Sequence, residues 1–208
     1  MKVLMINGSP HEKGCTYTAL REVAGELEKA GISVEIMHLG TKPIRGCTHC
    51  RACFDPEATG CAFDDGYVNL ALEKAKMADG LVFGSPVHYA AASGAITSFL
   101  DRFFFAGEGF DGKPGAAVVS CRRAGSTAAL DQLNKYFGIN GMPVVPSQYW
   151  NMVHGNTPDE VRQDLEGMQV MRTLGRNMAW LMKCIQAGRL AGLEPPEREE
   201  RAVTNFIR

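Results

Sequence analysis

The strongest constraint on the fold is a regular alternation of short apolar runs and longer amphipathic segments. The first apolar run, residues 2–6, ends at the turn sequence NGSP, which is typical of a strand buried on both faces. Residues 16–30 then carry apolar side chains at helical spacing and stop at Gly31. Because parallel strands need crossover connections, usually helices, this alternation predicts a parallel sheet with helices on both faces.

The same pattern repeats along the chain and predicts five strands. We expect strands at 2–6, 32–39, 80–84, 115–120 and 142–149, and helices at 16–30, 67–78, 93–105, 127–137 and 157–188. Pro143 and Pro146 interrupt the last strand, and proline removes ladder donors, so this strand is expected at a sheet edge. The predicted fold class is α/β, with a doubly wound, five-stranded parallel sheet.

Length and composition favour one domain of ordinary size. The chain has 208 residues and is 45% hydrophobic, so we expect one domain over residues 1–188 and an extended arm or tail over 189–208. A net charge of -1 argues against nucleic acid and membrane surfaces as partners. The first predicted strand begins almost at Met1, without a secretion signal, and no apolar stretch approaches ~18 residues, so the expected location is cytoplasmic.

The loop NGSPHEKGCTYT, residues 7–18, follows the first predicted strand, where doubly wound sheets bind ligands. It lacks the glycine pattern of dinucleotide-binding loops, and the spacing of Gly8 and Gly14 differs from that of a P-loop. Its hydroxyl groups and helix N-terminal amides suit a terminal phosphate monoester. A plain polar turn that caps the helix is an equal alternative.

Two further loops follow strands at the same end of the predicted sheet. Residues 85–94 combine a proline, an aromatic residue and small residues, which let the backbone lie against a flat ring. Residues 120–126 add Arg122 and Arg123, which also have a simpler interpretation as a solvated pair. Together the three loops suit one flat, phosphorylated ligand.

Four of the seven cysteines lie close together in the sequence. Cys47, Cys50, Cys53 and Cys61 have the spacing C-x2-C-x2-C-x7-C, and two-residue gaps let three thiolates converge on one cluster. In a reducing compartment such crowding indicates metal or redox chemistry before disulfides. Three alternatives stay open: a 4Fe-4S cluster, a structural zinc ion held by the same four thiolates or with His49 in place of one of them, and a metal-free loop.

Up to about Gly188, the sequence resembles the flavodoxin-like NAD(P)H-dependent FMN reductase family, including its iron-sulfur flavoprotein branch. The resemblance rests on NGSPHEKGCTYT, GSPVHYAAASGAITSFLDR and RRAGSTAALDQLNKYF. It implies a flavodoxin-like FMN-binding domain with strand order 2-1-3-4-5, a long C-terminal helix, and a cysteine-rich insertion loop at 44–63. It also implies NAD(P)H as electron donor and a homodimer or higher homo-oligomer.

The resemblance assigns roles to individual residues, with the chemistry carried by FMN and by no catalytic side chain. The phosphate and ribityl contacts would fall to Ser9, His11, Cys15, Thr16 and Tyr17. The ring would contact Pro86, Val87, His88, Tyr89 and Ala90, and its polar edge would meet Arg122, Arg123, Ala124 and Gly125. Cys15 stands where the family most often has asparagine, so a side-chain amide donor is lost there.

The predicted function is an FMN-dependent oxidoreductase that takes a hydride from NAD(P)H and passes electrons to a small-molecule acceptor. A quinone, a nitro compound, a flavin or a metal ion would serve as acceptor. One alternative is an iron-sulfur flavoprotein that carries electrons between ferredoxin and an acceptor. An alternative of another class is a non-catalytic sensor or interaction module that binds flavin or zinc.

Overall fold

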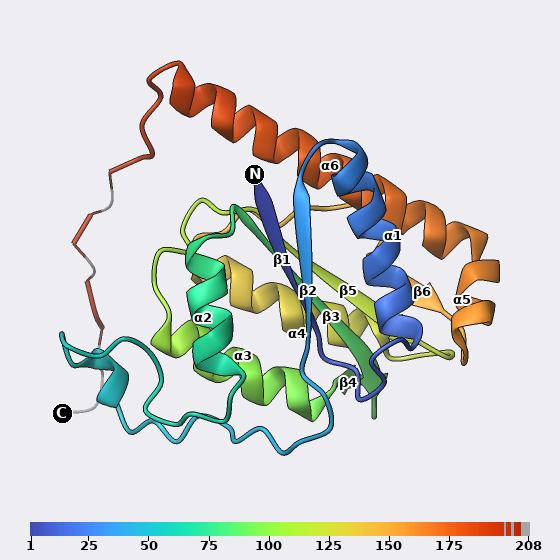
Figure 1. Cartoon of the computed structure of the whole chain (residues 1–208), viewed down its shortest axis with the longest axis horizontal. Helices are drawn as coiled ribbons and strands as arrows, with labels where there is room; N and C mark the ends of the chain where they lie inside the picture. The colour runs from blue at the N-terminus through green and yellow to red at the C-terminus, as the bar shows by residue number, and fades with distance from the viewer. Residues whose placement is uncertain (198, 201, 205–208) are drawn as a thin grey trace.

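A parallel sheet with helices on both faces forms the centre of the molecule (Figure 1). The computed structural model describes residues 1–197, 199–200 and 202–204. The parallel strands are β1 (Lys2–Asn7), β2 (Ser33–His38), β3 (Gly80–His88), β5 (Gly115–Cys121) and β6 (Met152–His154). Their order is β2-β1-β3-β5-β6, and the short β4 (Ala91–Ala92) pairs antiparallel with β3. With β4 set aside, the predicted order 2-1-3-4-5 is confirmed.

The helices form one layer on each side of the sheet (Figure 1). One layer consists of α1 (Cys15–Lys29), α5 (Pro158–Gln163) and α6 (Leu165–Leu190), and the other of α2 (Val68–Lys76), α3 (Gly94–Ala106) and α4 (Ser126–Ile139). Successive strand residues point to opposite faces of the sheet. Met5 and Val82 pack in the hydrophobic cluster on the α1 side, and Leu4 and Phe83 pack in the cluster on the α3 side. Within the described residues, no helix is both long and apolar enough to cross a bilayer.

The prediction for the last strand is wrong in position. β6 lies after the predicted segment 142–149, in which Val144 forms an isolated bridge with Gly115. The two prolines, which lack an N–H group, explain the shift, because a ladder cannot continue through them. β6 stands at the edge of the sheet, as expected for the fifth strand.

The predicted helix over 157–188 is two helices, α5 and α6. Thr157 caps α5 by accepting a hydrogen bond from the Glu160 amide. Asp164 then breaks the helix, because its carboxylate accepts hydrogen bonds from the amides of Gly167 (2.9 Å) and His154 (2.7 Å). α6 continues to Leu190, and residues 191–197 of the predicted tail carry no helix or strand. Residues 198, 201 and 205–208 of that tail lie outside the described residues.

The two long helices α1 and α6 approach closely at Gly175. A Cβ atom added at Gly175 would lie 2.7 Å from the Val23 carbonyl oxygen and 2.8 Å from Glu26 Cβ. Glu26, only 7% exposed, forms ion pairs with Lys29 (2.6 Å) and Arg176 (2.7 Å) beside this contact. Hydrogen bonds from Lys29 and Arg176 outweigh burial and lower the pKa of Glu26.

We expect Gly175→Ala to lower the free energy of unfolding by about 1–3 kcal/mol, because the added methyl group overpacks the helix contact. Urea unfolding followed by circular dichroism measures the change. The matched control is Gly25→Ala in α1, where an added Cβ meets no atom within 4 Å. It should raise stability by about 0.5–1 kcal/mol through helix propensity. An unchanged stability in Gly175→Ala would contradict the close contact.

The lowered pKa of Glu26 predicts a pH-dependent contribution to stability. Its folded pKa lies below its unfolded pKa, so the contribution is complete above the unfolded value of roughly 4.3 and disappears as pH falls through the folded value. Glu26→Gln should lower the free energy of unfolding by about 1 kcal/mol at pH 7; the effect is modest because both cations are largely exposed. Near pH 3 the variant and the native chain should be equally stable. Urea midpoints at pH 7, 5, 4 and 3 measure it. A stability difference between Glu26→Gln and the native chain that does not change with pH would contradict a contribution from these ion pairs.

Candidate functional site

The first and second predicted ligand loops and the end of β5 meet at the carboxyl end of the sheet. Ser93 Oγ donates a hydrogen bond to the Gly8 carbonyl oxygen (2.9 Å), which joins the second loop to the first. The hydroxyl groups of Thr16 and Ser120 share a hydrogen bond of 2.8 Å, which joins the first loop to the end of β5. The three segments are thus linked through buried hydroxyl groups.

The first loop is held in shape by its own polar groups. Asn7 Oδ1 accepts a hydrogen bond from the Ser9 amide (3.1 Å), and Asn7 Nδ2 donates to the Glu12 carbonyl oxygen (3.0 Å). Ser9 Oγ accepts from the His11 amide (3.1 Å), and His38 Nε2 lies 2.8 Å from the Ser9 carbonyl oxygen. Among the predicted phosphate residues, Ser9 and Thr16 are buried, Cys15 and Tyr17 are half-buried, and His11 is exposed. The loop is therefore pre-organised by its internal hydrogen bonds.

The N-terminus of α1 opens onto this loop and suits an anion. Gly14 is the N-cap residue, no described side chain caps this helix end, and its first turn holds no acidic residue. The first amides of a helix have no intrahelical acceptor and lie at the positive end of the helix dipole. Burial raises the pKa of the Cys15 thiol, which keeps this position uncharged. The amides of residues 15–17 therefore fit a terminal phosphate.

The second loop is a β-hairpin, which the sequence did not predict. β3 extends four residues beyond the predicted strand 80–84, and Val87 and His88 pair with β4. Tyr89 (φ 50°) and Ala90 (φ 60°) form its turn, as in a type I′ hairpin. A Cβ added at Gly125 (φ 86°) would lie 2.6 Å from Ala90 Cα, so the third loop lies directly against this turn. Positive φ in such residues costs free energy and is concentrated at functional sites.

The loops border a hollow of about 210 Å³, here called the loop hollow. It is lined by Gly8 and Pro10 of the first loop, His88 of the hairpin, Gly94 and Ala95 of α3, and residues 40–42 after β2. The other residues that are predicted to contact the flavin ring or its polar edge differ in burial. Half-buried are Pro86, Val87 and Gly125, and exposed are Tyr89, Ala90, Arg122, Arg123 and Ala124. The sequence motifs missed residues 40–42, because these residues follow a strand without a recognisable loop signature.

The four clustered cysteines line one narrow hollow, here called the cysteine hollow. Burial, followed by the neighbouring thiols of Cys61, Cys50 and Cys47, raises the pKa of Cys53. In the described part of the chain, no group of three His, Cys, Asp or Glu side chains is arranged to hold a metal ion, and His49 packs on the Phe105 ring at 5.5 Å. Four cysteine thiolates can hold either a structural zinc ion or an iron-sulfur cluster. The all-thiol donor set matches an iron-sulfur cluster.

Arg102 of α3 is buried in the wall of the cysteine hollow, and the sequence did not reveal its role. Its Nε donates to Cys61 Sγ (3.2 Å) and its Nη1 to the Arg45 carbonyl oxygen (3.2 Å) and to Asp65. Its Nη2 donates to the Phe63 carbonyl oxygen. Burial opposes the charge, but Cys61 and Asp65 outweigh it and raise the pKa of Arg102. A charged residue within the apolar helix sequence FLDRFFF is the signal that points to such a role.

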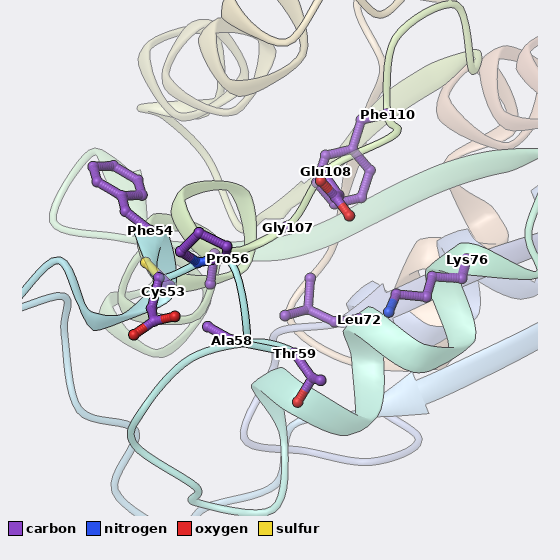
Figure 2. A pocket seen from close by; sticks show the side chains of 12 residues that line it. Cys53, Phe54, Pro56, Ala58, Thr59, Leu72, Lys76, Gly107, Glu108 and Phe110 are labelled. Carbon is purple, nitrogen blue, oxygen red and sulfur yellow. The ribbon is translucent and has the colours of Figure 1, made fainter.

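Cys53 also borders a wider cleft of about 260 Å³, here called the side cleft (Figure 2). The side cleft lies between the cysteine loop and α2, with Phe54 and Leu72 among its apolar lining residues. Lys76 from α2 and Glu108 from the segment after α3 add one charge of each sign. Cys53 therefore connects the cysteine hollow with an opening to solvent.

Helix α3 connects the loop hollow with the cysteine hollow. Gly94 and Ala95 in its first turn line the loop hollow, and Arg102 and Ala106 line the cysteine hollow. About two helical turns, or roughly 10 Å at 1.5 Å per residue, separate Ala95 from Arg102. The two candidate sites are therefore neighbours on one rigid element.

The fold and the site define an α/β protein of the flavodoxin type, with an uncapped helix N-terminus at the carboxyl end of the sheet and a separate thiol-lined hollow at α3. The chain belongs to the NADPH-dependent FMN reductase family, whose sequence model matches residues 1–157. An iron-sulfur flavoprotein of Methanocaldococcus jannaschii is 31% identical over 195 residues, which cover 89% of this chain and 100% of that relative. The predicted family and branch are thereby confirmed, and the chain is a flavin oxidoreductase.

Solved structures agree on the fold. A flavodoxin from the domain Archaea superposes with a TM-score of 0.58 and 17% identity, covering 88% of this chain and 99% of the flavodoxin. An NAD(P)H:quinone oxidoreductase from Methanothermobacter marburgensis superposes with a TM-score of 0.64 and 18% identity, covering 86% of this chain and 96% of that protein. The flavodoxin-like fold is confirmed.

Proposed function

We propose that this protein is an iron-sulfur flavoprotein that exchanges electrons between FMN bound at the three predicted ligand loops and a 4Fe-4S cluster bound by Cys47, Cys50, Cys53 and Cys61. The observation that carries this proposal is the course of α3, which begins beside the ligand loops and reaches the cysteine hollow, with a rise of roughly 10 Å between its lining residues Ala95 and Arg102. FMN accepts electrons as a hydride, and an iron-sulfur cluster transfers them singly. The name of the relative from Methanocaldococcus jannaschii supports the same combination.

The chain's own residues position FMN without acid or base chemistry. The amides of residues 15–17 donate to the phosphate at the N-terminus of α1, and the shape of the first loop is already set by Asn7 and Ser9. The ring lies against the hairpin residues 86–90. The exposed Arg122 and Arg123 supply positive charge for the polar edge of the ring, where negative charge develops on reduction.

Electrons leave through the cysteine loop. Cys53 borders both the cysteine hollow and the side cleft, so a small acceptor in the cleft or a docked ferredoxin would contact a cluster ligand (Figure 2). NAD(P)H is the proposed donor, in agreement with the family description. A homodimer in the cytoplasm remains our expectation for the working form.

A second candidate is an NAD(P)H-dependent FMN reductase whose cysteine loop holds no metal. The observation in its favour is that no described group of three ligands is arranged for a metal ion. In this case the reduced flavin passes electrons directly to a quinone, nitro compound, free flavin or metal ion. The two candidates share the FMN site and differ only at the cysteine loop.

Anaerobic purification and cluster reconstitution should separate the two candidates. We expect a flavin spectrum with added broad iron-sulfur absorption, and about four iron and four sulfide ions per chain. Cys50→Ser should lose the iron while keeping the flavin. The control Cys184→Ser changes an exposed cysteine of α6 and should keep both.

The outcome of NADPH addition adds a second criterion. If NADPH bleaches the flavin absorption, NADPH is the donor. If NADPH leaves the spectrum unchanged and reduced ferredoxin bleaches it, ferredoxin is the donor. A flavin spectrum without iron after reconstitution would favour the metal-free reductase. Absence of any visible chromophore would contradict both candidates.

The uncapped N-terminus of α1 predicts a specific loss of phosphate recognition in Gly14→Asp. An aspartate at the N-cap accepts hydrogen bonds from the helix amides that the phosphate needs, and its charge repels the phosphate. We expect FMN affinity to fall by about tenfold or more, or ~1.4 kcal/mol, while riboflavin affinity changes little. Fluorescence titration with both flavins measures this difference.

The matched control for this variant is Gly14→Ala. An added Cβ at Gly14 lies 2.9 Å from His11 Cβ, so the alanine variant reports the cost of that contact alone. If Gly14→Asp lowers the affinities for FMN and for riboflavin equally, the phosphate does not bind at this helix N-terminus.

A further inference from the structure

Arg102 has the features of a residue that serves the cysteine hollow rather than the general core. Its side chain is only 1% exposed, and a buried charge is costly unless it is paired and hydrogen-bonded. The flavin site does not use it, and its Nε donates directly to the sulfur of Cys61 at 3.2 Å. A neutral side chain would fill the same space without this cost.

The other contacts of Arg102 hold both ends of the cysteine loop. The carbonyl oxygen of Arg45 accepts from Nη1 before the first cysteine, and that of Phe63 accepts from Nη2 after the last cysteine. Asp65, 19% exposed, pairs with the same guanidinium through its Oδ2 atom. The planar guanidinium fork therefore ties the loop to α3 at three points besides the sulfur.

We propose that Arg102 is a positioning residue that closes the cysteine loop on α3 and raises the reduction potential of the cluster through Cys61, with Asp65 moderating its charge. This inference rests on the proposed 4Fe-4S cluster and deepens it. It assigns the tuning of the electron-transfer site to one buried ion pair.

The direction of the effect follows from electrostatics. Reduction adds one electron to the cluster and breaks no bond, so the reduced form carries one more negative charge. A positive charge and an N–H···S hydrogen bond at a ligand sulfur stabilise that form more than the oxidised form. The carboxylate of Asp65 acts in the opposite direction, because it neutralises part of the guanidinium charge. Burial of the pair limits screening by solvent.

A purely structural role would give a different pattern. If Arg102 and Asp65 only fasten the loop, then removing either partner loosens the same link and changes the potential in the same direction or not at all. If they tune the cluster, neutralising Asp65 raises the potential and neutralising Arg102 lowers it. The opposite signs are the signature of the proposal.

The test is a redox titration of the anaerobically reconstituted protein, followed by electron paramagnetic resonance of the reduced cluster. We expect Asp65→Asn to favour reduction by about tenfold in the equilibrium constant, ~59 mV for one electron, and Arg102→Met to disfavour it by at least as much. The matched control is Asp64→Asn, which removes the same charge from the preceding, exposed residue and should change the constant by less than ~threefold. The FMN potential is recorded in the same samples.

A second measurement covers the case in which Arg102→Met fails to bind iron. In the metal-free protein, limited proteolysis should cut residues 44–63 faster in Arg102→Met than in the native chain, because the tie to Arg45 and Phe63 is lost. Asp65→Asn keeps an acceptor for Arg102 and should bind the cluster, so its potential still tests the tuning.

Two results would overturn the proposal, and they differ from a failure of the proposed function. Shifts of the same sign in both variants, or a shift in Asp65→Asn no larger than in Asp64→Asn, would make Arg102 a structural residue only. A native chain that takes up no iron on reconstitution would refute the cluster itself and this inference with it. The first result appears only in the variants, and the second already in the native chain.

Discussion

The backbone hydrogen bond from the Gly8 amide to the Gly84 carbonyl oxygen, at 2.8 Å, is the interaction on which the functional end of the molecule depends. It comes directly after the last paired residues of β1 and β3, and it fixes the point where the first loop leaves the sheet. Gly84 has no side chain, and a Cβ there would lie 2.9 Å from Thr16 and 2.8 Å from Leu20. Helix α1 therefore packs directly on β3, with its uncapped N-terminus over the middle of the sheet's carboxyl end.

The same short segment also fixes the second site, through a continuous series of contacts. The carbonyl oxygen of Gly8 accepts a hydrogen bond from Ser93, which is the N-cap residue of α3. Ser93 thus sets where α3 starts, and α3 carries Arg102 to the cysteine hollow, where it donates to Cys61. Displacement at Gly8 would reach both hollows, because α3 moves as one rigid element. The relative position of the two hollows is consequently a property of the sheet rather than of the loops.

The sequence was sufficient for features that depend on periodicity and failed for those that depend on tertiary contacts. The first four strands and the position of the first loop followed from apolar runs and turn residues, which act locally, whereas the strand order followed from the family resemblance. The β3–β4 hairpin was missed because Tyr89 and Ala90 adopt positive φ without being glycine, asparagine or aspartate. The break at Asp164 depends on an amide of β6, and the role of Arg102 on four acceptors outside its helix. No local pattern contains such partners.

The position of Arg102 within α3 also has an electrostatic reason. The C-terminal end of α3 borders the cysteine hollow, and Cys53 Sγ donates to the Phe105 carbonyl oxygen at 3.7 Å. The last carbonyl groups of a helix carry about half a negative charge, which would disfavour additional electrons in the hollow. The last turn of α3 holds no basic residue. Arg102, one turn from the end, offsets this dipole, whereas at the other end of α3 the positive pole faces the loop hollow. One helix thus favours negative charge directly at its N-terminal end, beside the loop hollow, and at its C-terminal end, beside the cysteine hollow, only through a buried arginine.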